Sequence, residues 1–445
     1  MTRIFCGGIV VASTMLAAVV ARAENELGKV PATQPGLIKA GTGTLVVAAA
    51  NRSGGLVKVE NGVLRLPSGG SIFGAPSTPA DAVEVGQGGT LELEHWMTRA
   101  DLSLGTLPGD ADRIVVDGGR LCVTGVTGSG RGITVKPRGA VFDAAAGADW
   151  LLHNLRNPHD FVFVGTPPLT FTGVGNGRFD KAVPDAGKIV KDGTGTWIID
   201  SPVFKTGAVE VRQGLLEMTR PVLPDAQTVT VVAGAKLFLR FNGADAVGAL
   251  VLGGERLPPG TYNKKTHPDF LAGPGSLVVG GPAVVAGPAL TYELTKGWEE
   301  WPPNKLDAIT KSMDCAVGLY NAGGRFPRNI RVSYSKGTPT ADTAYYKKSI
   351  RFGGLISRCC ALHEMAHAVG SGTHWKWKNF KAEGKWTGSH AANLVRQLDG
   401  PAAKLSADKI HFWPYGMNFP KESSPVNDRI HVRIVEALCR DMGIY

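Results

Sequence analysis

The sequence predicts a multidomain chain, in which an N-terminal all-β unit of the β-helix or solenoid type is followed by an α+β domain. Three observations lead to this prediction. Glycine accounts for 59 of the 445 residues, which favours short strands and many turns over a helical bundle. A pattern of glycines and apolar pairs occurs twice before residue 280. A helical period, by contrast, appears only after residue 292.

The first residues have the features of a secretion signal. Arg3 supplies the positive start, residues 9–20 are apolar, and Ala21 and Ala23 are small residues of the kind a signal peptidase reads. We expect residues 1–23 to be removed and the mature chain to be secreted or held at the cell surface. The alternative is an uncleaved anchor, although the apolar stretch is shorter than the ~18 residues that span a bilayer. No later stretch reaches that length, so no transmembrane segment is expected after cleavage.

An internal repeat lies within the expected first domain, residues 24–280. Residues 38–66 align without a gap to residues 190–218, and both contain GTGT, an apolar pair and two glycines that punctuate a pair of strands. Weaker strand–glycine–strand units begin at residues 83, 114, 133 and 229. Such units bury their apolar faces only when they are stacked, which is the principle of a solenoid. A β-sandwich is the alternative fold.

This region resembles the autotransporter-associated β-helix repeat, and the residues that carry the resemblance are 39–47, 62–66, 191–199, 214–218 and 257–280. The resemblance implies a β-helical fold and a surface or secreted location, and it implies no chemistry. The histidines of this region are scattered, and we expect structural roles for them: His95, His153, His159 and His267. The first domain is therefore expected to act as a spacer or a binding surface.

The composition changes after an expected linker of small residues and prolines, residues 281–291. The segment from Tyr292 onward contains 22 lysines and arginines and 14 aspartates and glutamates. Most of the net charge of +10 therefore lies in the expected second domain, residues 292–445. No compact basic and aromatic stripe accompanies this charge, so we expect no nucleic-acid partner. A solvated surface explains the charge, and an extracellular or cell-surface acidic polymer would be a fitting neighbour.

The second domain has the alternation of elements expected of an α+β fold. Apolar spacing predicts a helix over residues 304–323, which Asn304 caps and Gly323 ends. Strands are expected at residues 330–334 and 349–352, and a helix follows over residues 355–370. Another helix begins near His390, and a final amphipathic helix carries Ile430, Ile434, Leu438 and Met442, with His431 assigned to packing.

The expected helix over residues 355–370 contains the motif HEMAH. Its histidines, His363 and His367, are four residues apart, so they lie on one face of the helix and can bind one zinc ion. Glu364 follows the first histidine, where its carboxylate can take a proton from a zinc-activated water and pass it to a leaving amine. The alternative is a helix with two solvated histidines. A preceding edge strand and the helix-ending Gly370 both favour the zinc interpretation.

The domain resembles the zincin metallopeptidases, and among them the metzincin-like group, whose pattern is HExxHxxGxxH. His363, Glu364, His367 and Gly370 meet the first eight positions, but the next ligand position falls on Thr373. Two histidines are candidates for the third ligand. His374 lies one residue beyond the expected position. His411 opens the segment HFWPYGMN. The whole stretch of residues 350–444, which contains this segment, resembles a group of secreted bacterial and fungal zincin-like proteins, and this resemblance implies His411 as the third ligand.

The segment after His411 supplies further candidates. Tyr415 is expected to donate a hydrogen bond to the tetrahedral oxyanion. Met417 is expected either to form the methionine turn beneath the zinc or to be an ordinary core residue. Four tryptophans either line the cleft or belong to the core: Trp375, Trp377, Trp386 and Trp413.

The cysteines agree with an exported protein. Oxidising conditions favour one or two disulfides among Cys315, Cys359, Cys360 and Cys439, with Cys122 left as a buried thiol.

The sequence therefore predicts a secreted or surface-attached zinc-dependent endopeptidase that acts on a protein or peptide substrate. One alternative is a surface adhesion or glycan-binding protein with an inactive peptidase-like domain. Another is zinc-dependent hydrolysis of a bond other than a peptide bond, because activation of water does not dictate which bond is attacked.

Overall fold

The structure is a computed structural model, and it describes residues 19–21, 36–47, 55–68, 72–73, 81–96, 104, 113–153, 161–201, 204–223, 225–281, 284–285 and 290–444. The expected signal peptide lies outside the described residues except for strand β1 (Val19–Ala21), and so does much of the expected linker. Within the described ranges, no helix is both long enough and apolar enough to cross a bilayer.

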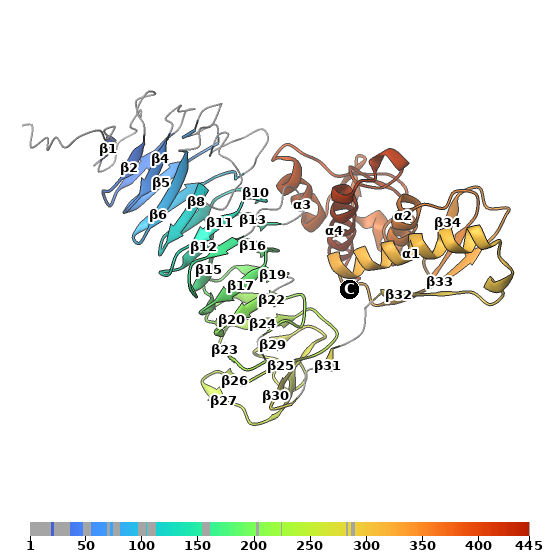
Figure 1. The fold of residues 1–445 in the computed structure, drawn as a ribbon, viewed down its shortest axis with the longest axis horizontal. Coiled ribbons are helices and arrows are strands. Elements are labelled where there is room, and N and C mark those ends of the chain that lie inside the picture. The colour runs from blue at the N-terminus through green and yellow to red at the C-terminus, as the bar shows by residue number, and fades with distance from the viewer. Residues whose placement is uncertain are drawn as a thin grey trace, which may run out of the picture.

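Three long sheets dominate the first part of the chain (Figure 1). One contains, in order, β1, β2 (Leu37–Lys39), β4 (Leu56–Val59), β6 (Ala82–Gly86), β8 (Ile114–Asp117), β11 (Ile133–Val135) and β14 (Phe161–Phe163). The second contains β10 (Val126–Ser129), β13 (Asp149–Leu152), β16 (Asn176–Phe179), β19 (Thr196–Ile199), β22 (Leu215–Met218), β24 (Lys236–Leu239) and β29 (Leu271–Ala272). The third contains β27 (Glu255–Arg256), β26 (Ala249–Leu252), β23 (Thr228–Val231), β21 (Ala208–Val211), β18 (Ile189–Lys191), β15 (Leu169–Gly173), β12 (Ala140–Ala144), β9 (Arg120–Val123), β7 (Gly89–Leu93), β5 (Gly62–Leu66) and β3 (Thr44–Val46).

Most strands that are neighbours in the sequence of the first part belong to different sheets. Strands β4 and β5 are consecutive, yet β4 pairs with β6 and β5 pairs with β7, both in parallel. Alternate side chains of each strand face the shared apolar core, as in β7, where every second residue is buried. Smaller sheets join β17 (Val183–Ala186) to β20 (Phe204–Thr206), and β25 (Gly243–Val247) to β28 (Gly260–Asn263), β30 (Ser276–Val279) and β31 (Val284–Val285).

The two aligned sequence segments adopt the same local structure at their glycines and lysines. Gly62 and Gly214 have φ angles of 66° and 62°, and a Cβ at either position would lie within 2.6 Å of a backbone oxygen. Only glycine fits there. Lys39 and Lys191 are fully buried, and each ammonium donates hydrogen bonds to backbone carbonyls of this turn, such as Asn61 at 3.1 Å and Gln213 at 3.0 Å.

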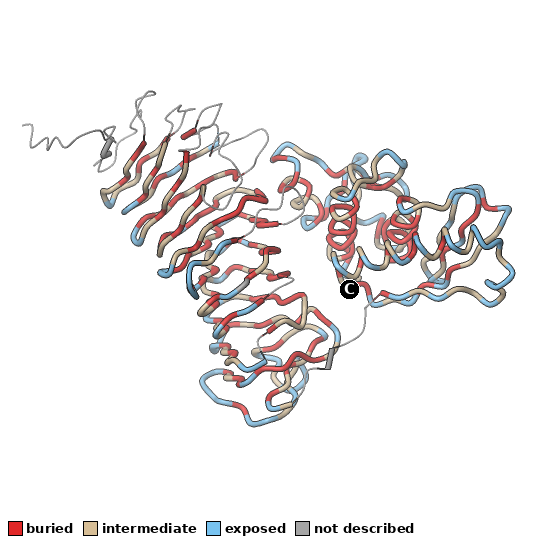
Figure 2. Tube along the Cα trace, in the orientation of Figure 1, coloured by how far each residue is buried: buried red, intermediate tan, exposed pale blue. Residues whose placement is uncertain are grey.

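The second part of the chain has its own sheet, in the order β32 (Leu290–Leu294), β33 (Arg328–Tyr334), β35 (Ser349–Phe352) and β34 (Ala341–Ala344). The first three strands are parallel, and β34 is an antiparallel edge strand. The main helices are α1 (Pro303–Gly323), α2 (Arg358–Val369), α3 (Ser389–Asp399) and α4 (Pro425–Asp441), and α2 and α4 are almost wholly buried (Figure 2). Short 3-10 helices are η2 (Trp298–Glu300), η3 (Trp375–Phe380) and η4 (Pro420–Glu422), and a small sheet joins β36 (Lys381–Ala382), β37 (Lys385–Trp386), β38 (Ser406–Ala407) and β39 (Phe412–Trp413).

The predicted fold class, an all-β solenoid unit followed by a separate α+β domain, is wrong for this chain. The structure is largely α/β-like: it consists mostly of parallel sheets and is 21 % helical, with the helices in the C-terminal part. The two parts also share packing, because α3 lies against β10 and β13, and Leu151 of β13 is buried in the core of the C-terminal part. Short strand–glycine–strand units in a sequence do not reveal which strands pair, nor that a helix covers one of the sheets.

Polar contacts hold the two parts together. A Cβ at Gly128 would lie 2.6 Å from the carbonyl oxygen of Gln397, so α3 approaches β10 at backbone distance. The Gln397 amide donates to the Asp149 carboxylate at 2.8 Å. Nearby, the Arg433 guanidinium of α4 donates to the carboxylates of both Asp180 and Asp200, and all three side chains are buried.

The expected disulfides are not found, because all five cysteines of the described residues are free. Cys359 Sγ lies 3.5 Å from the carbonyl oxygens of Met417 and Phe419, whereas Cys439 Sγ lies 3.6 Å from the carbonyl of Val369. These thiols thus contact backbone carbonyls rather than other thiols. Cys122 is buried and free, as expected.

Candidate metal centre

Helix α2 positions the first two candidate ligands. The Ser357 side chain caps the helix by accepting a hydrogen bond from the Cys360 N–H at 3.2 Å. Gly370, with φ at 126°, ends the helix, and its N–H donates to the carbonyl oxygens of Ala366 and His367. The helix begins later than expected, at Arg358, which leaves Leu355 outside it and 41 % exposed.

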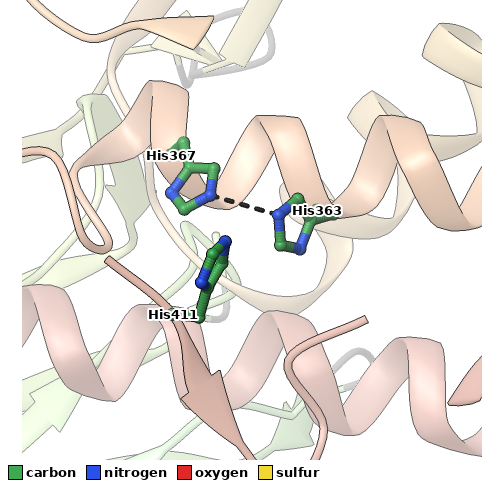
Figure 3. A group of neighbouring side chains, drawn as sticks. All are labelled: His363, His367 and His411. Atoms are coloured by element: carbon green, nitrogen blue, oxygen red, sulfur yellow. Dashed lines mark hydrogen bonds between the residues drawn. The ribbon is translucent and has the colours of Figure 1, made fainter. Parts of the chain in front are cut away.

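His411 comes from the turn between β38 and β39. The Asp408 carboxylate holds this turn by accepting hydrogen bonds from the N–H groups of Ile410 at 2.9 Å and His411 at 2.7 Å. The turn brings His411 to the side of α2, where its ring meets those of His363 and His367 (Figure 3). One ring nitrogen from each of these three histidines lies within 4.8 Å of the others. They form the sole cluster of this type in the described part of the chain.

Backbone carbonyls fix the tautomers of two of the histidines. His363 Nδ1 lies 3.0 Å from the carbonyl oxygen of Gly416, and His367 Nδ1 lies 2.8 Å from that of Ser371. A carbonyl only accepts, so Nδ1 carries the proton in both rings and each Nε2 presents a lone pair. The two Nε2 atoms are 3.2 Å apart. Two nitrogens at ~2.0–2.1 Å from a tetrahedral zinc are about 3.3 Å apart, so this spacing fits the ion.

Burial keeps these imidazoles neutral. Burial is the main cause that lowers the pKa of His363, and burial together with the neighbouring His363 lowers the pKa of His367 to about 4. A metal ligand must be unprotonated, and neutral rings do not repel a cation. His411 Nδ1 lies 3.5 Å from Asp408 Oδ2, which leaves Nε2 of this ring as the donor for an ion. The donor set therefore suits zinc.

Glu364 lies next to His363 on α2 and is only 7 % exposed. Burial is the main cause that raises the pKa of its carboxyl, and a hydrogen bond from Thr343 opposes this shift. Thr343 Oγ1, on edge strand β34, lies 2.7 Å from Glu364 Oε2 and 3.1 Å from the Glu364 carbonyl, and we assign its proton to the closer oxygen. A carboxyl with a raised pKa holds a proton more readily than an exposed one, which suits a group that takes up a proton and returns it.

The structure does not bring His374 into the cluster. His374 caps η3 by accepting a hydrogen bond from the Lys376 N–H at 3.2 Å, and its ring packs edge-on against Tyr345. The Tyr415 hydroxyl, expected at the oxyanion, donates instead to Asp399 at 2.8 Å. Met417 is buried in the C-terminal core, which fits the core alternative.

The four tryptophans have different environments. Trp377 and Trp386 are buried in the core and pack against each other with tilted rings, whereas Trp375 and Trp413 are 58 % and 45 % exposed. Among them, Trp413 lines the cleft beside the histidines. This cleft has a volume of about 630 Å³ and is lined by His363, Asp408, His411, Trp413, Asn418, Phe419, Lys421 and Glu422.

Sequence reasoning missed two residues that support the site. Asp408 could have been identified from the sequence, because it is a carboxylate three residues before the candidate ligand His411, and such a carboxylate can hold the turn or the ring of a ligand. Nothing in the sequence marks Thr343 as a site residue, because it reaches Glu364 only through the pairing of β34 with β35. The other histidines lie apart from the cluster: His431 is buried, His390 is exposed, His95 and His153 are buried in the first part, and His267 packs on Tyr262. His159 lies outside the described residues.

Comparisons with known proteins add no family: no family model, curated protein or solved structure matches this chain. The resemblances to zincin peptidases and to autotransporter-associated repeats therefore stay predictions.

Proposed function

We propose that this chain is a secreted or surface-attached, zinc-dependent endopeptidase, in which His363, His367 and His411 hold the ion and Glu364 is the general base. The convergence of three imidazoles beside a buried glutamate carries the proposal. Two hydrogen-bonded tautomers with their Nε2 atoms 3.2 Å apart support zinc as the ion. Zinc, when bound, supplies Lewis acidity and lowers the pKa of a water molecule to ~7.

Glu364 first accepts and then donates a proton in this proposal. Its Oε1 accepts the proton of the attacking water, while Oε2 accepts the hydrogen bond from Thr343 that holds the carboxylate in place. The raised pKa of Glu364 allows it to keep this proton and then give it to the departing amine. Acyl transfer to water and protonation of the amine together break the peptide bond.

The position of β34 favours a peptide over other substrates. This strand is the outer strand of its sheet and packs on α2, the helix that carries His363 and Glu364. An extended peptide can pair with such an edge through backbone hydrogen bonds. Thr343 of the same strand contacts Glu364, so a peptide bound there passes the base.

Metal content and peptide hydrolysis, measured on the full chain, test the proposal. We expect one zinc per chain in the wild type, its loss in His411→Ala and its retention in His374→Ala. Glu364→Gln is expected to keep zinc and to lose roughly 10²–10⁴-fold in kcat, whereas the control Glu383→Gln changes an exposed side chain and leaves kcat unaltered.

Three results would contradict the proposal: no bound zinc, zinc loss in His374→Ala alone, or full activity in Glu364→Gln. Bound zinc without hydrolysis of any peptide would favour the adhesion alternative. The secreted location is tested separately, by N-terminal sequencing of protein recovered from the medium, where a start at Glu24 is expected.

A further inference from the structure

The cleft beside the three histidines contains two features that the proposed chemistry does not use. One is a pair of exposed aromatic rings, Trp413 and Phe419, and the other is an exposed lysine, Lys421. We infer that this cleft selects peptides with a bulky apolar side chain next to a carboxylate, so that the side chain packs on Trp413 and Phe419 while the carboxylate meets Lys421. This inference rests on the proposed function, because it names the substrate class of the same site.

The aromatic rings are unusually exposed for their type. Trp413 is 45 % exposed and Phe419 is 60 % exposed, although Phe412 and Met417 of the same segment are buried. Large apolar side chains that face solvent in a concave site mark binding surfaces more often than isolated surface residues do. A volume of about 630 Å³ holds several peptide residues.

The loop that carries the two rings is held rigidly. The Asn418 amide donates to the Phe412 carbonyl at 3.0 Å, and the Asn418 N–H donates to the Glu422 carboxylate at 3.1 Å. Tyr415 and Met417 adopt φ angles of 66° and 56°, a left-handed conformation that non-glycine residues keep only when the surroundings enforce it. The loop is therefore preorganised, and a ligand need not order it on binding.

The charges of the cleft favour an anionic group at Lys421. The carboxylates of Asp408 and Glu422 already accept hydrogen bonds from backbone N–H groups of the cleft. Lys421 has no ion pair with another described residue, and its ammonium lies 5.9 Å from the centroid of the Phe419 ring. With a divalent ion on the histidines, the cleft has three positive charges, two from the ion and one from Lys421. The two negative charges of its lining belong to Asp408 and Glu422.

The proximity of Lys421 to Phe419 limits where the carboxylate can sit. An apolar side chain on Phe419 and a carboxylate at Lys421 are close enough to belong to the same residue or to adjacent residues of the peptide, since one residue spans at most ~3.6 Å. The carboxylate therefore comes either from a C-terminal apolar residue or from an aspartate or glutamate beside the apolar residue. Both sources offer the same chemistry to Lys421.

Binding to the zinc-loaded full chain carrying Glu364→Gln tests the inference without relying on turnover. The probes are fluorescein-labelled peptides of sequence Gly-Gly-Phe-Glu-Gly with an amidated end, measured by anisotropy. Companion probes replace Phe by Ala or Glu by Gln, and another pair ends in Phe as a free acid or as an amide. We expect the Phe probe to bind about tenfold more tightly than the Ala probe.

Variants of the cleft residues show which side chains produce the preference for the Phe probe and for a carboxylate. Trp413→Ala and Phe419→Ala are expected to reduce the Phe-over-Ala ratio by about fivefold each, and Lys421→Gln is expected to abolish the roughly threefold preference for a carboxylate. The matched controls are Trp375→Ala, an exposed tryptophan outside the cleft lining, and Lys336→Gln, an exposed lysine elsewhere. Both controls should keep the wild-type ratios. A preference for Glu over Gln identifies a side-chain carboxylate, and a preference for the free acid identifies a C-terminal one.

Equal binding of the Phe and Ala probes, or equal effects of Trp413→Ala and Trp375→Ala, would overturn the inference. In either case, bound zinc and hydrolysis of unrelated peptides would leave the proposed function standing. If the chain bound no zinc, the proposed function would fail, and the Phe-over-Ala ratio of the metal-free chain would still decide whether Trp413 and Phe419 form an apolar subsite.

Discussion

Replacement of Arg433 by methionine removes the central cation of the contact between the two parts of the chain. The Arg433 guanidinium donates to Asp180 at 2.8 Å, to Asp200, and to the Gly323 carbonyl at 3.1 Å. Burial tends to raise the pKa of Asp200, but Arg433, followed by Arg178 and Arg220, holds it far below its ordinary value. The Asp200 carboxylate therefore stays ionised only because these guanidinium groups surround it.

The size of the loss follows from what remains in Arg433→Met. Removing one partner of a buried ion pair costs about 3–5 kcal/mol. Arg178 still bonds to both aspartates at 2.8 Å, so the lower end of that range applies. A loss of about 3 kcal/mol, at a slope of roughly 3 kcal/mol/M in urea, shifts the unfolding midpoint by about 1 M.

Urea unfolding followed by tryptophan fluorescence measures this shift. The matched control is Arg351→Met, because Arg351 pairs with Asp342 on the surface and both side chains are about half exposed. Such exposed pairs contribute little, so the control midpoint should stay near that of the wild type. Equal midpoints for Arg433→Met and Arg351→Met would refute the idea that this ionic contact stabilises the fold.

Three further predictions concern the site and its supports. Thr343→Val should lower kcat about tenfold with KM unchanged, because Glu364 loses its orienting donor, and Thr343→Ser should restore kcat; a change in KM alone would contradict this role. Asp408→Asn should weaken zinc binding roughly 10–100-fold in a competition assay with a chelator, since the residue holds both the turn and the ring of His411; unchanged affinity would count against it. Burial lowers the pKa of His431 to about 4, below its unfolded value of ~6.5, so the unfolded chain takes up more protons between these values. Stability is thus expected to fall as pH drops from about 6.5 to 4, and His431→Asn should reduce the change of the urea midpoint across that window; an unaltered pH profile would exclude His431 as a cause.

Local chemistry made part of the site predictable. The spacing of His363 and His367 requires only one turn of helix, and Gly370 ends that helix where the sequence indicates. Strand β35 has the expected bounds, and α1 and α4 occupy the segments where apolar residues recur with a helical period. His411 was identifiable only through its sequence context, and the structure brings it to the other two histidines.

The remaining features depend on contacts that a sequence does not display. Thr343 reaches Glu364 because β34 turns back along β35, and nothing in the sequence around Thr343 marks that pairing. Cysteine counting predicted disulfides, but the thiols of Cys359 and Cys439 contact different carbonyls. The contact of α3 with β10 depends on Gly128, whose lack of a side chain gives no hint of the helix that covers it.

Helix α4 connects the interface to the candidate metal centre through its two faces. Arg433, Glu436 and Arg440, which are spaced to share one face, contact the charged side chains of the first part of the chain. On another face, His431 Nδ1 lies 2.7 Å from the Tyr415 carbonyl, and Nε2 lies 3.1 Å from the Leu362 carbonyl. Leu362 precedes His363 in α2, and Tyr415 precedes Gly416, whose carbonyl fixes the tautomer of His363.

Helix α4 is buried and has contacts on both faces. We therefore expect a change at Arg433 to reach the other face as a shift in the position of the helix rather than as a change in charge. The ionic contact at Arg433 reaches His363 only through packed helices, because Arg433 also donates to the Gly323 carbonyl at the end of α1, and the Tyr320 hydroxyl of α1 donates to the Leu362 carbonyl at 3.0 Å. Zinc affinity should therefore be nearly unchanged in Arg433→Met while the protein remains folded. The first part of the chain then acts on the candidate metal site as a platform that fixes α4, and His431 is one of the residues through which that position reaches α2.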